Sequence, residues 1–522
     1  MKSDVLVIGA GGAGLVSAIH AHEAGAKVRV ITKEYPTRSQ TSMAQGGINA
    51  AFGNVSEDSV DAHITNTLKS AHGIADAQAV EFLCSNALDA VNWLDSIGVC
   101  FSRTSDSKIA QRTLGGASAP RACYAQDYTG LKILHTLYDR CMALGIEMFN
   151  EKFLLDLIVE DGVVCGAKVL DIRTSEVELY EASSIILATG GYSCIYDKHS
   201  TNSLASTGDG VATAISAGVR AIDMEFIQFH PTAMKNSSVL ISEGARGAGG
   251  HLLNSKHQRF TNELAPRDEV ARAIYDEMQK GEDIFLDIRH LGEKFVDAEL
   301  PQERKLAKLY ENIDPVFELI PIKPVAHYTM GGIEVDDSSQ TNIKGLFAVG
   351  ECANHRVHGA NRLGGNSLLE LVVFGREAGK YAAEYASKNQ AKKVDADLDD
   401  VKLVLAQDAE LDFYAIKESL ADIFYKNVGI SRDKESLQKT LEIVQEYIDK
   451  LPLMGVKDKS KTYNTNLKEF FEFKNILELS RVVLLGAIAR DESRGAHFRS
   501  DNAFEKDEFK KHTVIDKDGV VL

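Results

Sequence analysis

The chain opens on an apolar run that leads into a cluster of small residues. Residues 4–8 have the pattern of a short buried strand, residues 15–24 that of a helix, and residues 27–32 that of a second strand. The turn between the first strand and the helix consists of Gly9, Ala10, Gly11, Gly12, Ala13 and Gly14. Glycines at this place allow the backbone to approach a pyrophosphate at the helix N-terminus. The pattern therefore predicts a dinucleotide-binding βαβ unit.

An acidic residue follows the second strand. Glu34 lies 20 residues after Gly14, near the position at which an acid binds a ribose hydroxyl in such units. Its place directly after Thr32 and Lys33 fits a solvated loop charge equally well. Both interpretations stay open from the sequence.

Two later segments repeat the combination of a buried strand and glycine. Residues 184–189 (SIILAT) run into Gly190-Gly191, and residues 345–351 read GLFAVGE. Because these units lie far apart, they predict one discontinuous domain with an insertion of roughly 100 residues, a length typical of one domain.

The remaining boundaries follow from changes in composition. Residues 388–400 are polar and charged and read as a linker. Beyond the linker, Leu437, Leu441, Val444 and Ile448 recur at helical spacing, which predicts a helical C-terminal domain. The predicted division is a dinucleotide-binding domain over residues 1–222 and 336–388, an insertion over 223–335 and a helical domain over 389–522.

Composition and charge narrow the class of protein. The 522 residues are 44% hydrophobic and 25% charged, as expected for a folded chain of about three domains. The net charge of −17 argues against nucleic-acid binding. No apolar stretch is long enough to span a bilayer, and the strand pattern begins too early for a signal peptide, so we expect a cytoplasmic protein.

Cysteines and histidines give no sign of a metal centre. The seven cysteines are scattered singly without a CxxC pair, so we expect neither an iron–sulfur cluster nor a structural zinc site. We predict reduced thiols and no metal ligands in this chain.

The insertion and the segment after it carry most of the unusual polar motifs. They are QFHPT (228–232), SEGARG (242–247), PRD (266–268), HYTMGG (327–332) and HGANRLGGNS (358–367). A lone histidine or an Arg–Asp pair is more often structural than catalytic. From residue types and spacing alone, the chain reads as a flavin or nicotinamide nucleotide enzyme whose substrate stays open.

At these residues the sequence resembles a known family, the flavoprotein subunit of succinate dehydrogenase and fumarate reductase, and more distantly L-aspartate oxidase. Further shared motifs are TRSQTSMAQGGINAAFGN (37–54), STGDG (206–210), APRDEVARAI (265–274), HGANRLGGNSLLELVVFGR (358–376) and RDESRGAHFR (490–499). The resemblance covers nearly the whole chain. It implies an α/β fold with a Rossmann-like FAD-binding domain, an inserted α+β capping domain that closes on the substrate, and a C-terminal helical domain.

The resemblance also implies roles for the polar residues. The two carboxylates of succinate or fumarate would be bound by His230, Ser242, His327 and Arg362. Arg267 would donate the proton to one alkene carbon while the flavin exchanges a hydride with the other. Because arginine is a weak acid, this role needs a relay that replaces the proton, and Glu243 and Arg246 match that relay. FAD would contact the turn 9–14 together with Thr32, Lys33, Ser39, Gln40, Thr41, Ala44, Gln45, Gly46, Gly47, Asp209, Glu351, Ser367 and Leu368.

Three positions depart from the family pattern. Gln40 stands where relatives carry the histidine that bonds covalently to the flavin, so we predict non-covalent FAD. In this family that change is associated with a lower flavin potential, which slightly favours fumarate reduction. Leu114 replaces a phenylalanine against the substrate, and Ala248 replaces a glutamate outside the relay.

Two other functions compete with interconversion of fumarate and succinate. L-aspartate oxidase shares the FAD site and the lack of a covalent flavin, but that branch has an acid where this chain has Leu114. The other alternative is a flavin-binding subunit without catalysis. By resemblance, the electron partner is an iron–sulfur subunit docked on a membrane anchor that handles quinone, which would place the chain at the inner face of the cell membrane.

Overall fold

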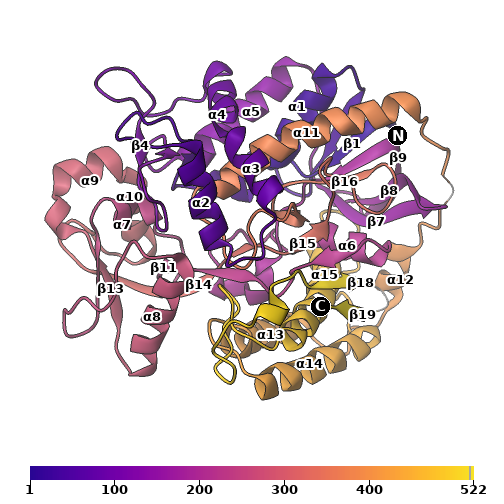
Figure 1. Cartoon of the computed structure of the whole chain (residues 1–522). Helices are drawn as coiled ribbons and strands as arrows, with labels where there is room; N and C mark the ends of the chain where they lie inside the picture. Colours follow the sequence, from indigo (N-terminus) through magenta and orange to yellow (C-terminus); the bar gives the residue numbers. More distant parts are fainter. Residues whose placement is uncertain (395, 517–518) are drawn as a thin grey trace.

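The computed structural model describes residues 1–394, 396–516 and 519–522 (Figure 1). Its largest sheet has seven strands in the order β6-β2-β1-β9-β8-β7, with β16 also paired with β9. The strands are β1 (Lys2–Ile8), β2 (Val28–Ile31), β6 (Glu147–Phe149), β7 (Lys152–Glu160), β8 (Val163–Asp171), β9 (Glu176–Leu187) and β16 (Leu346–Ala348). The pairs among β6, β2, β1, β9 and β16 are parallel, whereas β7 and β8 are antiparallel. The predicted strand–turn–helix–strand unit forms the centre of this sheet.

Several elements extend beyond the predicted ranges. Helix α1 (Gly12–Glu23) begins at the second half of the glycine turn rather than at residue 15. Its residues 12–21 are all buried, so no polar face marks its start. Strand β9 begins eight residues before the predicted residue 184, because its first half is only partly buried and reads as polar.

Helices pack on the large sheet and on one another. They are α2 (Val60–Ser70), α3 (Ala77–Ser85), α4 (Ala87–Ser96), α5 (Thr129–Ala143), α6 (Asp209–Ser216) and α11 (Asn366–Lys388). Helices α6 and α11 pack on the large sheet, α5 packs on α1, and α3 and α4 pack on α11, with α2 beside α3. A Cβ atom on Gly379 of α11 would lie 2.5 Å from the Ser17 carbonyl oxygen of α1. The missing side chain therefore allows α11 to lie directly on α1, which brings the motif at 358–367 to the glycine turn.

A four-stranded antiparallel sheet forms a separate body at the left of Figure 1. Its order is β11 (Ile227–Met234), β14 (Ile320–Thr329), β13 (Ile284–Asp287) and β12 (His251–Leu253). The helices around it are α7 (Glu243–Gly247), α8 (Arg267–Gln279), α9 (Glu293–Glu299) and α10 (Pro301–Tyr310). Its buried apolar side chains form a core of their own that runs from Met234 to Ile322. We call residues 227–329 the capping segment.

The C-terminal part packs on the large sheet and shares its core. Its helices are α12 (Asp400–Ala406), α13 (Phe413–Asn427), α14 (Lys434–Asp449) and α15 (Thr465–Ala489). Of the apolar positions predicted at helical spacing, Leu437 and Val444 are fully buried in α14. Their cluster also contains Leu6 and Ile185 of the large sheet.

Short strands at the C-terminus add a feature that the sequence did not predict. A five-stranded sheet has the order β17-β15-β10-β18-β19. Its strands are β10 (Ala221–Ile222), β15 (Gly332–Glu334), β17 (Ala353–Asn354), β18 (Val514–Asp516) and β19 (Gly519–Val521). They come from both sides of the predicted boundaries at residues 222, 335 and 388, so the sheet links the predicted domains. A three-stranded sheet is formed by β3 (Ile48–Asn49), β5 (Ala122–Cys123) and β4 (Gln111–Arg112).

Candidate active site

One large cavity runs from the glycine turn to the capping segment. Its empty volume is about 1630 Å³ with the open mouth included, which exceeds the roughly 300–1,000 Å³ of a site for one small molecule. Of the predicted site residues, all except Gly14 and Arg246 line this cavity. Segments from residue 8 to residue 371 thus meet around a space for a dinucleotide and a further small molecule.

The glycine turn forms a cradle at the N-terminus of α1. Gly9 has a φ of +112°, and a Cβ atom there would lie 2.2 Å from the Ala188 carbonyl oxygen. A Cβ on Gly14 would lie 2.0 Å from the Gly9 carbonyl oxygen, so Gly14 shapes the turn from behind. Within the described residues no side chain caps Gly11. The Gly12 N–H donates to Thr41 Oγ1, so the anion site at the cavity rests on the other N–H groups in the first turn of α1.

Three buried polar atoms at the cavity wall have no partner among the described protein groups. They are the Oγ atoms of Ser39 and Thr189 and the Oε1 atom of Gln45. Burying such groups without a hydrogen bond is unfavourable. Together with the cradle they fit a bound nucleotide that supplies their partners.

Lys33 lies at the cavity wall, where two carboxylates neutralise its charge. Its Nζ atom is 2.6 Å from Asp209 Oδ2 and 2.8 Å from Glu472 Oε1 of α15. Burial alone lowers the pKa of Lys33, but the two carboxylates outweigh it and raise the pKa above the ordinary value. Asn475 of α15 donates to the other oxygen of Asp209 at 2.9 Å. Helix α15 thus holds the two predicted FAD contacts, Lys33 and Asp209, in place. The charge of Lys33 is already neutralised by its two acidic partners.

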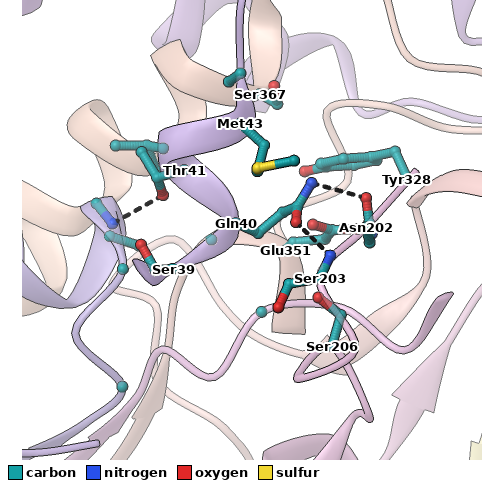
Figure 2. Close-up of a pocket in the computed structure, with 18 of the residues that line it drawn as sticks. Ser39, Gln40, Thr41, Met43, Asn202, Ser203, Ser206, Tyr328, Glu351 and Ser367 are labelled. Atoms are coloured by element: carbon teal, nitrogen blue, oxygen red, sulfur yellow. Dashed lines mark hydrogen bonds between the residues drawn. The ribbon is translucent and has the colours of Figure 1, made fainter. Parts of the chain in front are cut away.

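Gln40 is held by hydrogen bonds at both ends of its amide. Its Nε2 donates to Asn202 Oδ1 at 2.9 Å, and its Oε1 accepts the Ser203 backbone N–H at 2.7 Å (Figure 2). Thr41 accepts the Gly12 N–H at 3.0 Å, which links the same loop to the start of α1. The amide is therefore fixed as part of the wall.

Glu351 is a partly buried acid at the cavity wall. Burial raises the pKa of Glu351 to about 7, although the N–H and hydroxyl of Thr329 donate to its Oε1 at 2.9 and 3.2 Å. The start of α11, with Ser367 and Leu368, completes this wall. The Glu351 side chain can thus be either protonated or ionised near neutral pH.

A buried histidine supports the start of α11. His63 Nε2 lies 2.9 Å from Asn366 Oδ1, which also accepts from Asn49 at 2.8 Å. Burial lowers the pKa of His63 to about 4. His63 is therefore neutral in the folded protein at neutral pH.

We expect His63→Gln to make the fold less sensitive to acid. Below about pH 6.5 the unfolded wild-type chain protonates His63 and the folded protein does not. The wild type therefore loses up to about 1.4 kcal/mol per pH unit on acidification relative to the variant. Thermal unfolding of both proteins at several pH values measures the difference, and other titrating groups cancel in the comparison. The exposed control His257→Gln should follow the wild type, and equal acid sensitivity of His63→Gln and wild type would contradict the assignment.

Two histidines of the capping segment face each other at the inner end of the cavity. The ring centroids of His230 and His327 are 4.8 Å apart. His230 Nδ1 accepts the Thr232 backbone N–H at 3.2 Å, so the proton of the neutral ring sits on Nε2. His327 Nδ1 lies 2.7 Å from Thr201 Oγ1. Burial lowers the pKa of both rings well below the ordinary value, which makes them neutral hydrogen-bond groups.

Arg267, Glu243 and Arg246 form a continuous buried chain. Arg267 Nη2 lies 2.6 Å from Glu243 Oε2, and Arg246 Nη2 lies 3.3 Å from Glu243 Oε1. The Gly115 N–H also donates to Oε1 at 3.0 Å. Burial raises the pKa of Glu243, but Arg267 and Arg246 outweigh it and lower the pKa below its ordinary value. Glu243 is therefore a carboxylate between two guanidinium groups, with Arg246 behind it and Arg267 at the cavity.

Gln228 connects Arg267 to Arg362. Its Oε1 accepts from Arg267 Nη1 at 2.9 Å and from Arg362 Nη2 at 3.1 Å. Its Nε2 donates to Asn361 Oδ1 at 2.7 Å. Gln228 belongs to the QFHPT motif, and nothing in the sequence indicated this role. Two buried cations separated by one neutral acceptor form a site for an anion.

Arg362 also rests on an aromatic ring. Its guanidinium carbon lies 4.2 Å from the ring centroid of Tyr328, whose hydroxyl donates to Glu370 at 2.7 Å. Burial, and then the charge of Arg267, lower the pKa of Arg362 to about 10, which leaves it protonated at neutral pH. Tyr328 is the second contact that the sequence analysis missed, because no spacing marks a ring beneath an arginine.

Ser242 and Leu114 complete the inner end. Ser242 begins α7, and its Oγ accepts the Gly244 N–H at 3.0 Å. Leu114 is buried and lies at the cavity wall. The inner end thus offers two guanidinium groups, two imidazoles and a hydroxyl, which matches a small molecule with two carboxylates.

Comparison with known proteins identifies the family of this site. Residues 4–368 match the family described as FAD binding domain, and residues 417–521 match the family described as fumarate reductase flavoprotein C-term. The fumarate reductase flavoprotein subunit of Haemophilus influenzae is 38% identical, covering 98% of this chain and 91% of the relative. The chain belongs to the fumarate reductase and succinate dehydrogenase flavoprotein subunits.

Other members of the fumarate reductase and succinate dehydrogenase family match this chain over nearly its full length. The succinate dehydrogenase flavoprotein subunit of Rickettsia conorii is 39% identical, covering 100% of this chain and 94% of the relative. A solved structure of Escherichia coli quinol fumarate reductase has a TM-score of 0.94 and 36% identity, covering 99% of this chain and 95% of that one. The predicted α/β fold is confirmed, and the chain is a flavoprotein oxidoreductase subunit that binds FAD. Among the described residues no helix is long and apolar enough to cross a membrane.

Proposed function

We propose that this chain interconverts fumarate and succinate, with His230, Ser242, His327 and Arg362 binding the two carboxylates. The observation that carries the proposal is the pair of buried cations, Arg267 and Arg362, which share only the neutral acceptor Gln228. Arg246, Arg267 and Arg362 carry three positive charges against the one carboxylate of Glu243, so a dianion at this place would balance the remaining two. The N–H of His230 Nε2 then supports a carboxylate oxygen.

In the proposed mechanism Arg267 donates a proton to one alkene carbon of fumarate and takes it back in the reverse direction. Its guanidinium is fixed by Glu243 and Gln228, so its position does not depend on the substrate. Glu243 and Arg246 continue the chain away from the cavity and can return the proton to Arg267. FAD bound along the cavity supplies the hydride chemistry at the other carbon. The capping segment carries most of these groups and excludes water when it covers the substrate.

The electrons need a partner outside the cavity. We propose an iron–sulfur subunit and, through it, a membrane anchor that exchanges electrons with quinone. The name of the Escherichia coli relative, quinol fumarate reductase, supports this arrangement. In the described part of the chain no group of three metal-binding side chains occurs. The proposed location is the inner face of the cell membrane, reached through these partners.

The flavin is non-covalent in this proposal. The Gln40 amide, hydrogen-bonded to Asn202 and Ser203, occupies the place of the family's flavin-linking histidine. An amide does not form the histidyl–flavin bond. In the family this loss goes with a lower flavin potential, so we propose that fumarate reduction is slightly favoured.

We expect FAD to leave the protein on denaturation. After acid precipitation the yellow colour and fluorescence should appear in the supernatant, and a denaturing gel should show no fluorescent protein band. Ser39→Ala, next to Gln40 in the same loop, should also release all FAD. Fluorescence retained in the protein band would contradict the non-covalent assignment.

An anaerobic experiment separates the proposed function from L-aspartate oxidation. Fumarate added to protein with chemically reduced flavin should restore the oxidised flavin spectrum, and L-aspartate added to oxidised protein should leave it unchanged. Leu114 supports this expectation, because an apolar side chain at the cavity offers nothing to a substrate ammonium group. Bleaching by L-aspartate would assign the chain to L-aspartate oxidase. No reaction with either compound would support the non-catalytic alternative.

A further inference from the structure

Two fully buried acids meet where the capping segment contacts the loop before α5. Asp127 lies in that loop, and Glu303 lies in the first turn of α10. Asp127 Oδ2 accepts the backbone N–H groups of Gln302 at 2.7 Å and Glu303 at 3.0 Å. The acid thus caps α10 across a separation of 175 residues in sequence.

Each acid has one oxygen without a partner. Asp127 Oδ1 and Glu303 Oε2 are buried and accept no hydrogen bond from the described protein groups. Glu303 Oε1, by contrast, accepts the Ser242 backbone N–H at 3.0 Å. Leaving a buried carboxylate oxygen unpaired is unfavourable, and two neighbouring carboxylates do not both stay ionised.

The nearest cation, Arg112, does not pair with either acid, because its N–H groups bind backbone carbonyl oxygens. The guanidinium of Arg112 donates to the carbonyl oxygens of Gln45 at 2.8 Å, Gly46 at 2.8 Å and Gln126 at 2.7 Å. The other titratable groups that face the acids or Arg112 are the phenols Tyr124 and Tyr128 and the carboxylate Glu299. These groups add no further positive charge.

The electrostatic environment raises the pKa of both acids, which favours one proton kept by the two together. Burial raises the pKa of Asp127 to about 6, despite the two backbone N–H groups at its Oδ2. Burial, and then the charge of Asp127, raise the pKa of Glu303 well above its ordinary value. The N-terminus of α10 favours the negative charge on Asp127. The proton therefore belongs on Glu303.

We propose that Glu303 is a protonated carboxylic acid beside the Asp127 carboxylate, and that it positions Ser242 for the substrate. A proton on the unpartnered Oε2 of Glu303 removes one of the two buried negative charges. Glu303 remains free to accept the Ser242 N–H with its other oxygen. The substrate part of the inference rests on the proposed function of Ser242.

The acid pair connects the two sides of the active site. Glu303 holds Ser242 within the capping segment, and Asp127 belongs to the loop whose Gln126 carbonyl accepts from Arg112. Arg112 in turn holds the backbone of Gln45, one of the predicted FAD contacts. Glu303 is thus a positioning residue, because it acts through Ser242 and not by touching the substrate.

The experiment compares Glu303→Gln, Glu303→Leu and the exposed control Glu293→Gln in the full FAD-loaded chain. The glutamine variant is neutral and keeps an acceptor for the Ser242 N–H, whereas leucine removes that acceptor. Infrared difference spectra between wild type and each variant should show the C=O stretch of a protonated carboxylic acid that disappears in both Glu303 variants and shifts in D2O. The control should leave this band unchanged.

Fumarate kinetics then test the positioning role. Glu303→Gln should keep KM within about threefold of wild type, and Glu303→Leu should raise KM about tenfold, as expected for about 1.4 kcal/mol from one misplaced hydrogen bond. For both variants kcat should change less than KM. A missing carboxylic-acid band in wild type, or a band that persists in Glu303→Gln, would overturn the proton assignment. Equal KM values for the glutamine and leucine variants would overturn the positioning role.

The spectroscopic test does not depend on the proposed reaction. If wild type reacts with neither fumarate nor succinate but loses the band in Glu303→Gln, the proposed function fails and the acid pair stands. If wild type reduces fumarate and the band is absent, the acid pair fails alone.

Discussion

Arg267→Ala should lower kcat for fumarate reduction by about 10²–10⁴-fold, the range for a positioned general acid. The loss is expected because Arg267 is the guanidinium that Glu243 and Gln228 fix at the cavity. FAD should stay bound, since the glycine turn and the loop around Gln40 are not part of the hydrogen-bonded row formed by Arg267, Glu243 and Arg246. Stopped-flow reoxidation of reduced enzyme by fumarate measures the chemical step directly. A rate within about tenfold of wild type would remove Arg267 as the proton donor.

Two further variants separate catalysis from stability in this test. Removing Arg267 leaves the buried carboxylate of Glu243 with fewer partners, which itself destabilises a fold. Arg267→Lys keeps a positive charge near Glu243 and should remain folded while it loses the guanidinium geometry. Arg289→Ala removes an arginine that pairs with Asp287 at the surface of the same segment. It should show wild-type kinetics.

The sequence predicted those parts of the fold that depend on local chemistry. The glycine turn between β1 and α1 was predicted, because only glycine tolerates the contacts at Gly9 and Gly14. The start of α1 was placed three residues late, because a helix buried on all sides lacks the periodicity that marks its first turn. The sheet partners of β10 could not be predicted. They come from residues 332–334 and 514–516, and nothing local in a two-residue strand specifies its neighbours.

The candidate site was predicted residue by residue, but its connections were not. Motif resemblance indicated Glu243, Arg246 and Arg267, and the structure brings them into one hydrogen-bonded chain. Gln228 lies 134 residues from Arg362, so no spacing rule relates the amide to the second guanidinium. Glu303 reads in the sequence as an ordinary charge on an amphipathic helix, and only its complete burial singles it out. Such contacts depend on how the capping segment packs on the FAD-binding part.

The packing also explains why the site is assembled from two bodies. The capping segment has an apolar core of its own, and Ile227, Phe229 and Ala326 near its two ends also pack into the core of the large sheet. Arg267 and His230 belong to this segment, whereas Arg362 follows β17 outside it. The two cations, joined through Gln228, therefore come from two different bodies. In the proposed function a dicarboxylate would contact both bodies, so we expect substrate binding to favour the covered cavity.

Arg362→Ala should weaken dicarboxylate binding more than any other single change outside the proton chain. A charge-assisted hydrogen bond to a carboxylate contributes about 1.5–3 kcal/mol, which corresponds to a roughly 10- to 150-fold increase in Kd. Arg362 is buried, stacked on Tyr328 and still protonated at neutral pH, so water does not substitute well for its charge. Titration of oxidised enzyme with malonate, followed by flavin absorbance, measures Kd without turnover.

The matched control for Arg362 is Arg356→Ala, six residues earlier in the same segment. Arg356 pairs with Glu334 at 2.6 Å and does not line the cavity, so malonate should bind as in wild type. Arg362→Lys should recover only part of the affinity, because an ammonium group keeps the charge but lacks the planar fork that reaches a carboxylate and Gln228 together. An unchanged Kd in Arg362→Ala would place the dicarboxylate elsewhere in the cavity. The shared acceptor Gln228 would then serve only to keep two buried cations apart, and the argument for a dianionic substrate would no longer hold.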